Sequence, residues 1–505
     1  MSERAPSRLA ASRLAAWLRA LPERPGWIAA LVAVAAALKT APVAMGIDEG
    51  IWSTIGWLWW DRGLVPYRDA VDSKPPGVLL LFTLNAGLFG PSVWMPRALG
   101  VACVAGTTWL LYRLVRPAAG PFGAFATSVA FGGAMCWRST DGGYPAACET
   151  FMVACSVLAL SLIARAWSLP SPGSGWLALC GAGFALGAAV SFKQVALTTI
   201  GAFALLPLLH RREAGHVGSA WRQSMLIVAC AAAGAMLWLA PILLSGASME
   251  EVYRCVWRTL WDGGTAGGQT RNLEQIAQRV WDDGSRLLIF LPALAILPLS
   301  AAAQPPPLHR RWLVVWLLLE CLASLSAVRL HNHMLRQAMP PLAIAFGLGA
   351  AWLVGPDGPR RHRATVAAVL LLMFVPLALP TRATFAWLQT GRMPEAAAVR
   401  WLRDNVEPDE TVLIYSGPAG GLHALAGRAP ASRHFHTILL RSPGAAEELR
   451  CDVEQRRPRA VLIDVSERAR QLPPAWLTRL VEREYQMGPR LSAMGADLQA
   501  YLRER

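Results

Sequence analysis

Long, uninterrupted runs of apolar residues are the feature that most restricts how this 505-residue chain can fold. A helix that spans a bilayer needs roughly 20 such residues, with a range of about 17–25. Only 16% of the residues are charged, well below the share in soluble domains. The runs therefore predict an α-helical polytopic membrane protein. Its eleven predicted spans are Trp27–Met45, Arg97–Val115, Pro121–Met135, Pro145–Trp167, Trp176–Phe192, Val195–Leu209, Met225–Leu244, Leu287–Ala303, Trp312–Val328, Ala338–Val354 and Ala364–Leu379.

The apolar segment Val78–Gly90 is ambiguous, because counting it as a twelfth span would invert every segment after it. It is 13 residues long and is bounded by Pro75-Pro76 and Pro91, so it is too short for a span. With eleven spans and the N-terminus inside, the arginine clusters between spans lie on the cytoplasmic side, as the positive-inside rule requires. We therefore predict that Val78–Gly90 is a helix at the outer membrane surface.

Residues 1–26 form a basic segment that we expect to be cytoplasmic. No small-residue cleavage site follows it, and Lys39 interrupts the next apolar run, so we expect an uncleaved first span rather than a signal peptide. The net charge of +15 comes largely from arginines in the short linkers between apolar runs, where they set topology. Nucleic acid is therefore not expected as a partner.

The composition changes after Leu379, where short helical and strand patterns replace the apolar runs. Residues 382–505 are a normal size for one small α/β domain. An odd number of spans places this domain outside the cytoplasm, after a transmembrane domain of residues 27–381. Its predicted helices are Glu395–Asn405, Ala445–Gln455 and Leu472–Glu484, and its predicted strands are Thr411–Tyr415, Ala460–Val465 and Leu498–Leu502.

The first outer loop, residues 46–96, carries five carboxylates between two apolar segments. Carboxylates at a membrane boundary are costly to desolvate, so they need water, a cation or a catalytic task. Asp48 and Glu49 are adjacent and point in different directions, so one can act as a base while the other supports it. The alternative is a water-facing pair at a helix end.

Lys74 is the only lysine in this loop, in a chain whose positive charge comes nearly all from arginine. A lone lysine at the membrane boundary suits a phosphate group, although a snorkelling side chain is the alternative. Pro75 and Pro76 fix the path of the chain directly after it. Asp69 and Asp72 lie close by without a firm assignment.

Three further parts of the predicted outer face carry charged side chains. Glu149 and Lys193 lie at the outer ends of spans, where an exposed carboxylate and a snorkelling lysine are the alternatives. A dense cluster of Arg329, His331, His333 and Arg336 precedes Pro340-Pro341 and can clamp a phosphate or diphosphate. The two histidines also suit a metal on an extended strand, but no complete ligand set is visible, so metal binding stays open.

A phosphate clamp beside carboxylates on the outer face indicates a phosphate-bearing lipid as substrate. A lipid-phosphate sugar donor would carry its leaving group at the membrane surface. Its reaction needs a base for the acceptor hydroxyl and positive charge for the departing phosphate. The first outer loop can supply the base, and Lys74 with Arg329 and Arg336 the positive charge.

These residues form a pattern that resembles the first outer loop of the GT-C membrane glycosyltransferases. It reads Asp48-Glu49 … Gly63-x-x-Pro66-Tyr67-x-Asp69-x-x-Asp72-x-Lys74-Pro75-Pro76-Gly77. The closest group is the bacterial relatives of protein O-mannosyltransferases and of lipid A aminoarabinose transferase. The resemblance covers roughly residues 30–350 and extends to Arg97, Glu149-Thr150-Phe151-Met152 and Arg329-x-His331-x-His333.

The resemblance implies a GT-C fold and a polyprenyl-phosphate sugar donor. The acceptor would be a lipid, glycan or protein at the outer face of a bacterial inner membrane, with inversion at the anomeric carbon. A first-loop Asp would be catalytic, and Lys74 with an Arg would hold the donor phosphate. Some relatives bind a divalent metal near the donor, but Ser73 and Lys74 replace the Glu and His found there in the two groups, which puts a metal ligand in doubt.

Two other functions fit parts of the sequence. A transporter or flippase of lipid-linked saccharides should carry ionisable residues near the bilayer centre, and Glu320 is the only clear acidic residue in mid-span. A non-catalytic assembly protein would use residues 382–505 to bind partners, but it would leave the first-loop carboxylates without a role. The charges gather at one face, which favours the enzyme.

Overall fold

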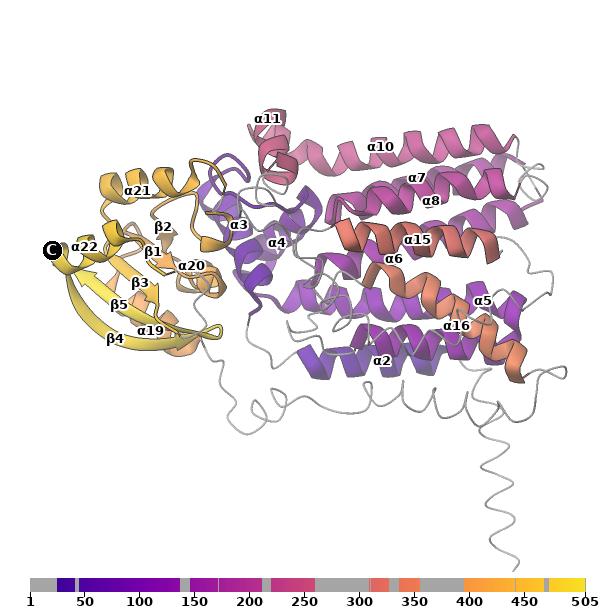
Figure 1. Cartoon of the computed structure of the whole chain (residues 1–505), viewed down its shortest axis with the longest axis horizontal. Helices are drawn as coiled ribbons and strands as arrows, with labels where there is room; N and C mark the ends of the chain where they lie inside the picture. Colours follow the sequence, from indigo (N-terminus) through magenta and orange to yellow (C-terminus); the bar gives the residue numbers. More distant parts are fainter. Residues whose placement is uncertain are drawn as a thin grey trace, which may run out of the picture.

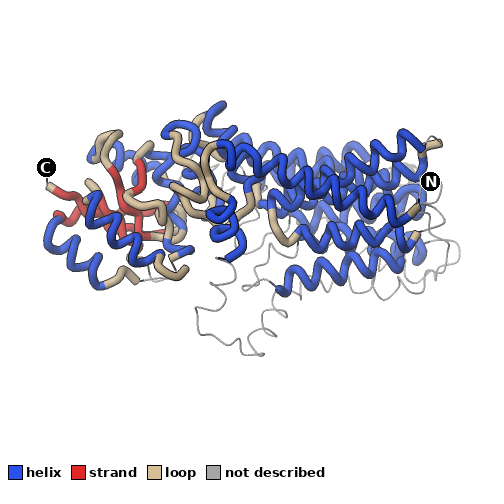
Figure 2. Tube along the Cα trace, turned by 90° about the horizontal axis from the view of Figure 1, so that it is seen from above, coloured by secondary structure: helices blue, strands red, loops and turns tan. Residues whose placement is uncertain are grey.

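The computed structural model describes residues 25–40, 45–136, 146–170, 172–210, 219–258, 308, 310–326, 336–354, 395–440, 442–466 and 472–504. A bundle of long apolar helices forms one end of the molecule, and a sheet with its helices forms the other (Figures 1 and 2). Helices α3 (Ile47–Arg62) and α4 (Pro76–Phe89) lie between the two parts (Figure 1). All strands of the described chain therefore lie beyond the end of the bundle that carries the first outer loop.

The bundle helices run side by side with roughly parallel axes (Figure 1). They are α2 (Pro25–Thr40), α5 (Trp94–Cys136), α6 (Cys148–Ser168), α7 (Pro172–Phe192), α8 (Ala196–Leu209), α10 (Ala220–Leu244), α15 (Arg310–Ser326) and α16 (Met339–Val354). By length and composition, four stretches of the described chain can cross a membrane: Trp94–Cys136, Cys148–Ser168, Gly173–Phe192 and Ala220–Leu244. The protein is thus a multi-pass membrane protein.

The predicted spans coincide with these helices wherever the structure describes them. Helix α5 joins two of the predicted spans across a kink at Gly120, whose φ of 64° is left-handed. Pro117 and Pro121 flank the kink, where each removes a backbone hydrogen bond of a regular helix. The predicted spans Leu287–Ala303 and Ala364–Leu379 lie outside the described residues, so the total of eleven stays a prediction.

The first outer loop is more helical than expected. Asp48 and Glu49 lie in the first turn of the 16-residue helix α3, which the sequence did not predict. The helix predicted at Val78–Gly90 is present as α4, which starts two residues earlier because Pro76 occupies its first turn. Its place at the outer membrane surface stays a prediction. A Cβ on Gly77 would lie 2.6 Å from the carbonyl oxygen of Ser191, so glycine allows α4 to start against the end of α7.

The C-terminal part contains a five-stranded sheet in the order β2-β1-β3-β5-β4. Its central strand β3 (Ala460–Asp464) is buried throughout and pairs in parallel with β1 (Thr411–Tyr415) and antiparallel with β5 (Ala496–Arg503). Strand β2 (Ala429–Pro430) pairs in parallel with β1, and β4 (Tyr485–Ala493) forms a hairpin with β5. Helices α19 (Ala396–Asn405), α20 (Leu422–Ala426), α21 (Ala445–Arg456) and α22 (Ala475–Glu484) accompany the sheet.

The C-terminal part packs directly on α3. The Thr54 hydroxyl donates a hydrogen bond of 2.9 Å to the carbonyl of Gly420, and the Met45 amide donates one of 3.2 Å to Glu395. A Cβ on Gly50 would lie 2.9 Å from the Cα of Gly421, so two glycines let the backbones approach. The sheet part is therefore held against the helix that begins with Asp48.

Candidate active site

A buried ion pair holds the start of α3. The Glu49 carboxylate accepts hydrogen bonds from Arg97 Nε at 3.0 Å and from the terminal nitrogen Nη2 at 2.6 Å. It also accepts the Gly46 amide at 2.9 Å, the half of a capping box that a glycine at the N-cap allows. Both side chains of the pair are almost completely buried. Glu49 is therefore engaged on both oxygens, and it links α3 to the first turn of α5.

Asp48 has the opposite environment. Its side chain is 47% exposed and lies 3.9 Å from the ammonium of Lys74, which is 25% exposed. Partial burial lowers the pKa of Lys74, but the carboxylates of Asp48 and Asp72 outweigh this effect and leave the pKa above its ordinary value. The two adjacent carboxylates therefore differ in what they can do. Glu49 is fixed in the interior, whereas Asp48 faces solvent beside a cation and can contact a substrate.

A tight turn sets the position of Lys74. Tyr67 is fully buried and adopts a left-handed φ of 69°, which is strained for a side chain of this size. Its hydroxyl donates a 2.7 Å hydrogen bond to the Lys74 carbonyl. Asp69 accepts the Val65 amide at 2.8 Å and forms an ion pair with Arg68 at 2.7 Å. Tyr67 and Asp69 therefore shape the loop.

Asp72 is a buried carboxylate next to this lysine. It accepts hydrogen bonds from the Trp52 indole at 2.9 Å and from the Ser73 amide at 2.7 Å, and it is 4% exposed. Burial raises the pKa of Asp72 to about 6, against the opposing effect of Lys74. The group therefore takes up a proton in the folded state at a higher pH than in the unfolded chain.

We expect this proton uptake to make stability depend on pH through Asp72. Because the folded pKa is raised, the protonated carboxyl favours the folded state as the pH falls through about 6. Relative to the Asp72→Asn variant, the wild type should gain on the order of 2–3 kcal/mol between pH 7 and pH 4. Thermal unfolding of the detergent-solubilised protein, followed by tryptophan fluorescence, measures this difference.

The exposed Asp61→Asn substitution at the other end of α3 serves as the control for the loss of one carboxylate. Equal pH dependence of the wild type and of Asp72→Asn would contradict a raised pKa at this position.

Glu149 and Lys193 form a second buried ion pair, between the first turn of α6 and the end of α7. The exposed carboxylate and the snorkelling lysine considered from the sequence are therefore not what the structure contains. Arg336 is also buried and lies within electrostatic range of Glu149. Glu149 in turn lies within electrostatic range of Lys74. The structure thus brings both ion-paired helix ends and Arg336 to the same region as the first outer loop.

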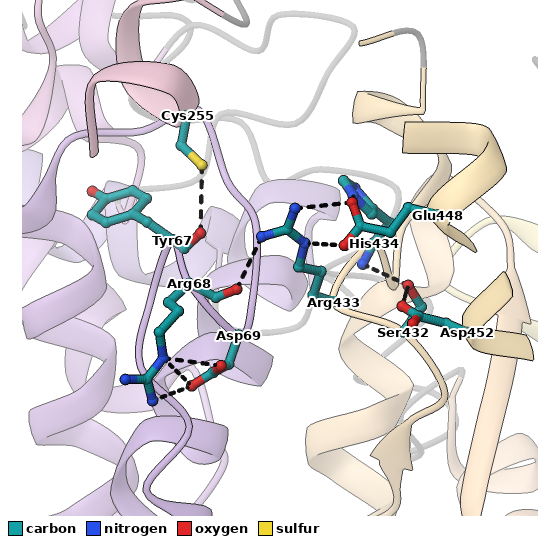
Figure 3. A network of polar contacts seen from close by, with 9 residues as sticks. All are labelled: Tyr67, Arg68, Asp69, Cys255, Ser432, Arg433, His434, Glu448 and Asp452. Atoms are coloured by element: carbon teal, nitrogen blue, oxygen red, sulfur yellow. Dashed lines mark hydrogen bonds and ion pairs between the residues drawn. The ribbon is translucent and has the colours of Figure 1, made fainter. Parts of the chain in front are cut away.

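Residues of the C-terminal part also reach this region, and the sequence analysis missed them. The Arg433 guanidinium donates a 3.2 Å hydrogen bond to the carbonyl of Arg68 and forms an ion pair with Glu448, which also contacts His434 at 3.1 Å (Figure 3). His436 donates from Nε2 to the Val71 carbonyl at 3.2 Å. The spacing His434-x-His436 repeats that of His331-x-His333, and this repeat is the sequence feature that could have indicated these residues.

Three predicted site residues, Arg329, His331 and His333, lie outside the described residues. Among the described residues, no group of three or more His, Cys, Asp and Glu side chains is arranged to hold a metal ion. Asp72 accepts bonds from Trp52 and Ser73, whereas Asp48 faces solvent beside the ammonium of Lys74.

Comparison with known proteins identifies the fold. A family model of dolichyl-phosphate-mannose-protein mannosyltransferases matches residues 73–244. The crystal structure of ArnT from Cupriavidus metallidurans bound to undecaprenyl phosphate is similar over 94% of this chain and 98% of that chain, at a TM-score of 0.63 and 16% identity. The chain has the GT-C fold of membrane glycosyltransferases. The predicted resemblance to GT-C membrane glycosyltransferases is confirmed for the fold.

Two other GT-C structures are similar to the chain. The mycobacterial arabinofuranosyltransferase AftD matches over 96% of this chain and 40% of that one, at a TM-score of 0.53 and 15% identity. The Archaeoglobus fulgidus oligosaccharyltransferase in complex with Zn and sulfate matches over 86% of this chain and 68% of that one, at a TM-score of 0.52 and 14% identity. The comparison with curated protein sequences found no match.

Proposed function

We propose that this GT-C protein transfers a sugar from a polyprenyl-phosphate donor to an acceptor hydroxyl at the outer face of the membrane. The observation that supports this most is the placement of Asp48 beside Lys74, 3.9 Å apart, where both side chains are partly exposed at the end of the bundle. The pair offers a base for the acceptor hydroxyl and a positive charge for the donor phosphate. Substrate binding has to separate the two groups, because attack and departure take place on opposite faces of the anomeric carbon. The neighbouring charges are paired in buried contacts and form a fixed frame.

In the proposed reaction, Asp48 accepts the proton of the acceptor hydroxyl as its oxygen forms a bond to the anomeric carbon. The bond between that carbon and the phosphate oxygen breaks, and its electron pair leaves with the polyprenyl phosphate. A positive charge at the departing phosphate lowers the barrier because negative charge develops there. Lys74 supplies this charge, and Arg336 is a second candidate. Attack from the face opposite the leaving group inverts the anomeric carbon.

Glu49 takes a positioning part in this mechanism. Its two oxygens bind Arg97 and the Gly46 amide, so it holds the first turn of α3 and, with it, the backbone of Asp48. Arg329, His331 and His333 stay predicted donor contacts. The C. metallidurans ArnT structure holds undecaprenyl phosphate, which makes this lipid the natural first probe for the donor site. We propose the inner membrane of a bacterium as the location, with the site and residues 382–505 on the periplasmic side.

The contacts of Glu320 weaken the alternative of a transporter. One carboxylate oxygen accepts hydrogen bonds from the Thr199 hydroxyl at 2.5 Å and from the Trp316 indole at 2.9 Å. The acid therefore joins α15 to α8 inside the bundle. Such an interhelical hydrogen bond is a structural role for a polar residue in a membrane.

Replacement of Lys74 by Met should weaken the binding of undecaprenyl phosphate about 10- to 100-fold, because a charge-assisted contact to the phosphate is lost. Met keeps the length of the apolar stem. Quenching of tryptophan fluorescence in the detergent-solubilised protein can follow the titration. The Arg254→Met variant, which removes an exposed ion pair with Glu250, is the matched control and should bind as the wild type does. Unchanged affinity of Lys74→Met would refute the phosphate role.

The reaction itself is tested in a deletion strain. Mass spectrometry of lipid-linked sugars and of cell-surface glycans should show one polyprenyl-phosphate sugar that accumulates and one sugar that disappears from the surface. Complementation with the wild-type chain should reverse both changes. A deletion strain with unaltered lipid-linked sugars and surface glycans would refute the proposed function.

A further inference from the structure

A strap of the C-terminal part, residues 433–436, runs along the loop that ends in Lys74. Both backbone groups of Val71 are bonded to this strap: its amide donates to the Arg433 carbonyl at 3.2 Å, and its carbonyl accepts His436 Nε2 at 3.2 Å. Arg433 adds the bond to the Arg68 carbonyl (Figure 3). The strap thus contacts the chain only a few residues before Asp72 and Lys74.

His436 is 3% exposed, and burial lowers its pKa to about 4, although the bond to Val71 acts in the opposite direction. The imidazole is therefore neutral. Because Nε2 bonds a carbonyl, this nitrogen carries the hydrogen, and Nδ1 is left as an acceptor. The ring also lies within electrostatic range of Asp48 and Lys74.

Packing alone does not account for a histidine at this position. Nδ1 of His436 is buried without a hydrogen-bond partner in the described part of the chain, and a buried acceptor without a partner costs free energy. A hydrocarbon ring such as phenylalanine would fill the space without that cost. What the imidazole adds is the donor at Nε2, which fixes the carbonyl of Val71.

We propose that His436 is a positioning residue of the donor site, which holds the Val71 carbonyl and so places Lys74 against the phosphate of the donor lipid. This inference rests on the proposed function. According to this inference, the C-terminal part takes part in donor binding by holding the loop through Val71. The Tyr67 hydroxyl holds the same loop at the Lys74 carbonyl.

The test compares three substitutions at position 436 in the full-length, detergent-solubilised protein, with undecaprenyl phosphate as the probe. Gln can place an amide nitrogen near the position of Nε2, so His436→Gln should bind within about twofold of the wild type, since the hydrogen bond is kept. His436→Phe removes the donor, and His436→Asn is too short to reach. Both should lose about 3- to 10-fold in affinity, which corresponds to one hydrogen bond.

His423 provides a matched control. It is a fully buried histidine of the same part of the chain, it bonds the Arg428 carbonyl through Nδ1, and its Nε2 likewise has no hydrogen-bond partner in the described structure. Among the described residues it forms no hydrogen bond to the first outer loop, and its ring packs edge-on against Phe435 of the strap, a contact that a phenylalanine ring can keep. His423→Phe should therefore bind the lipid with wild-type affinity, even if it changes the midpoint temperature of thermal unfolding.

The possible results separate the two proposals. A wild-type protein that does not bind undecaprenyl phosphate overturns the proposed function and this inference together. A wild type that binds, with His436→Phe and His436→Asn binding equally well, overturns the inference alone. If His436→Phe does not fold, the difference between Gln and Asn at this position decides the question. Equal losses for His423→Phe and His436→Phe would show a general effect of stability and also overturn the inference.

Discussion

The Asp48→Asn substitution should lower the rate of sugar transfer about 100- to 10,000-fold, the range that a general base contributes. Asn keeps the shape of the side chain but cannot accept the proton of the acceptor hydroxyl at neutral pH. The side chain is 47% exposed, so its replacement leaves no buried charge behind, and the fold should be retained. Complementation of a deletion strain, with mass spectrometry of surface glycans and lipid-linked sugars over time, measures the rate.

Asp61→Asn is the matched control for this substitution, because Asp61 is an exposed carboxylate at the opposite end of the same helix. It should complement as the wild type does. Thermal unfolding should show both variants within a few degrees of the wild type. Transfer at the wild-type rate by Asp48→Asn would remove Asp48 from the mechanism and return the role of base to another carboxylate.

The Arg97→Met substitution should have the largest effect on stability. It leaves the Glu49 carboxylate buried without its counter-ion, and breaking a buried ion pair in this way costs roughly 3–5 kcal/mol. Chemical denaturation of the detergent-solubilised protein, followed by tryptophan fluorescence, should show the loss as a lower midpoint. The substitution should also reduce transfer, because the first turn of α3 carries Asp48.

The double variant Glu49→Leu/Arg97→Met removes both charges and should recover much of the lost stability, since apolar pairs often replace buried ion pairs at little cost. Arg254→Met, which breaks an exposed pair on the same face, should cost less than about 1 kcal/mol. If Arg97→Met alone were as stable as the double variant, the buried Glu49 carboxylate would not need its counter-ion, and this prediction would be wrong.

The candidate site consists of buried ion pairs, which form a fixed frame, and of two exposed charged groups that can contact a substrate. The frame consists of the ion pairs of Glu49 with Arg97 and of Glu149 with Lys193, which join the ends of helices. Asp48 and Lys74 face solvent from this frame. Because buried pairs restrict the movement of the helix ends, the two exposed groups are placed before a substrate arrives, which lowers the cost of binding in the reactive geometry.

The elements of the C-terminal part show where prediction from the sequence works. The strand Thr411–Tyr415 was predicted with its bounds, and the helix at Ala445 within one residue, because short apolar runs and amphipathic patterns decide them locally. Strand β4 was missed because Gly488, Pro489 and a bulge between Met487 and Arg490 interrupt its alternation. Its partner β5 stabilises it through a hairpin turn at Met494-Gly495, where both residues have positive φ.

By itself, the sequence determined the membrane class, the positions of the described bundle helices and the set of charged residues that gather on one face, because hydrophobic length and the spacing of a motif are local properties. Only the tertiary structure decided what each charge does. Asp48 and Glu49 are neighbours in the sequence, yet one faces Lys74 and the other binds Arg97, since a helix turns consecutive side chains in different directions. His436 reaches Val71 across 365 residues of chain, a contact that no local pattern predicts.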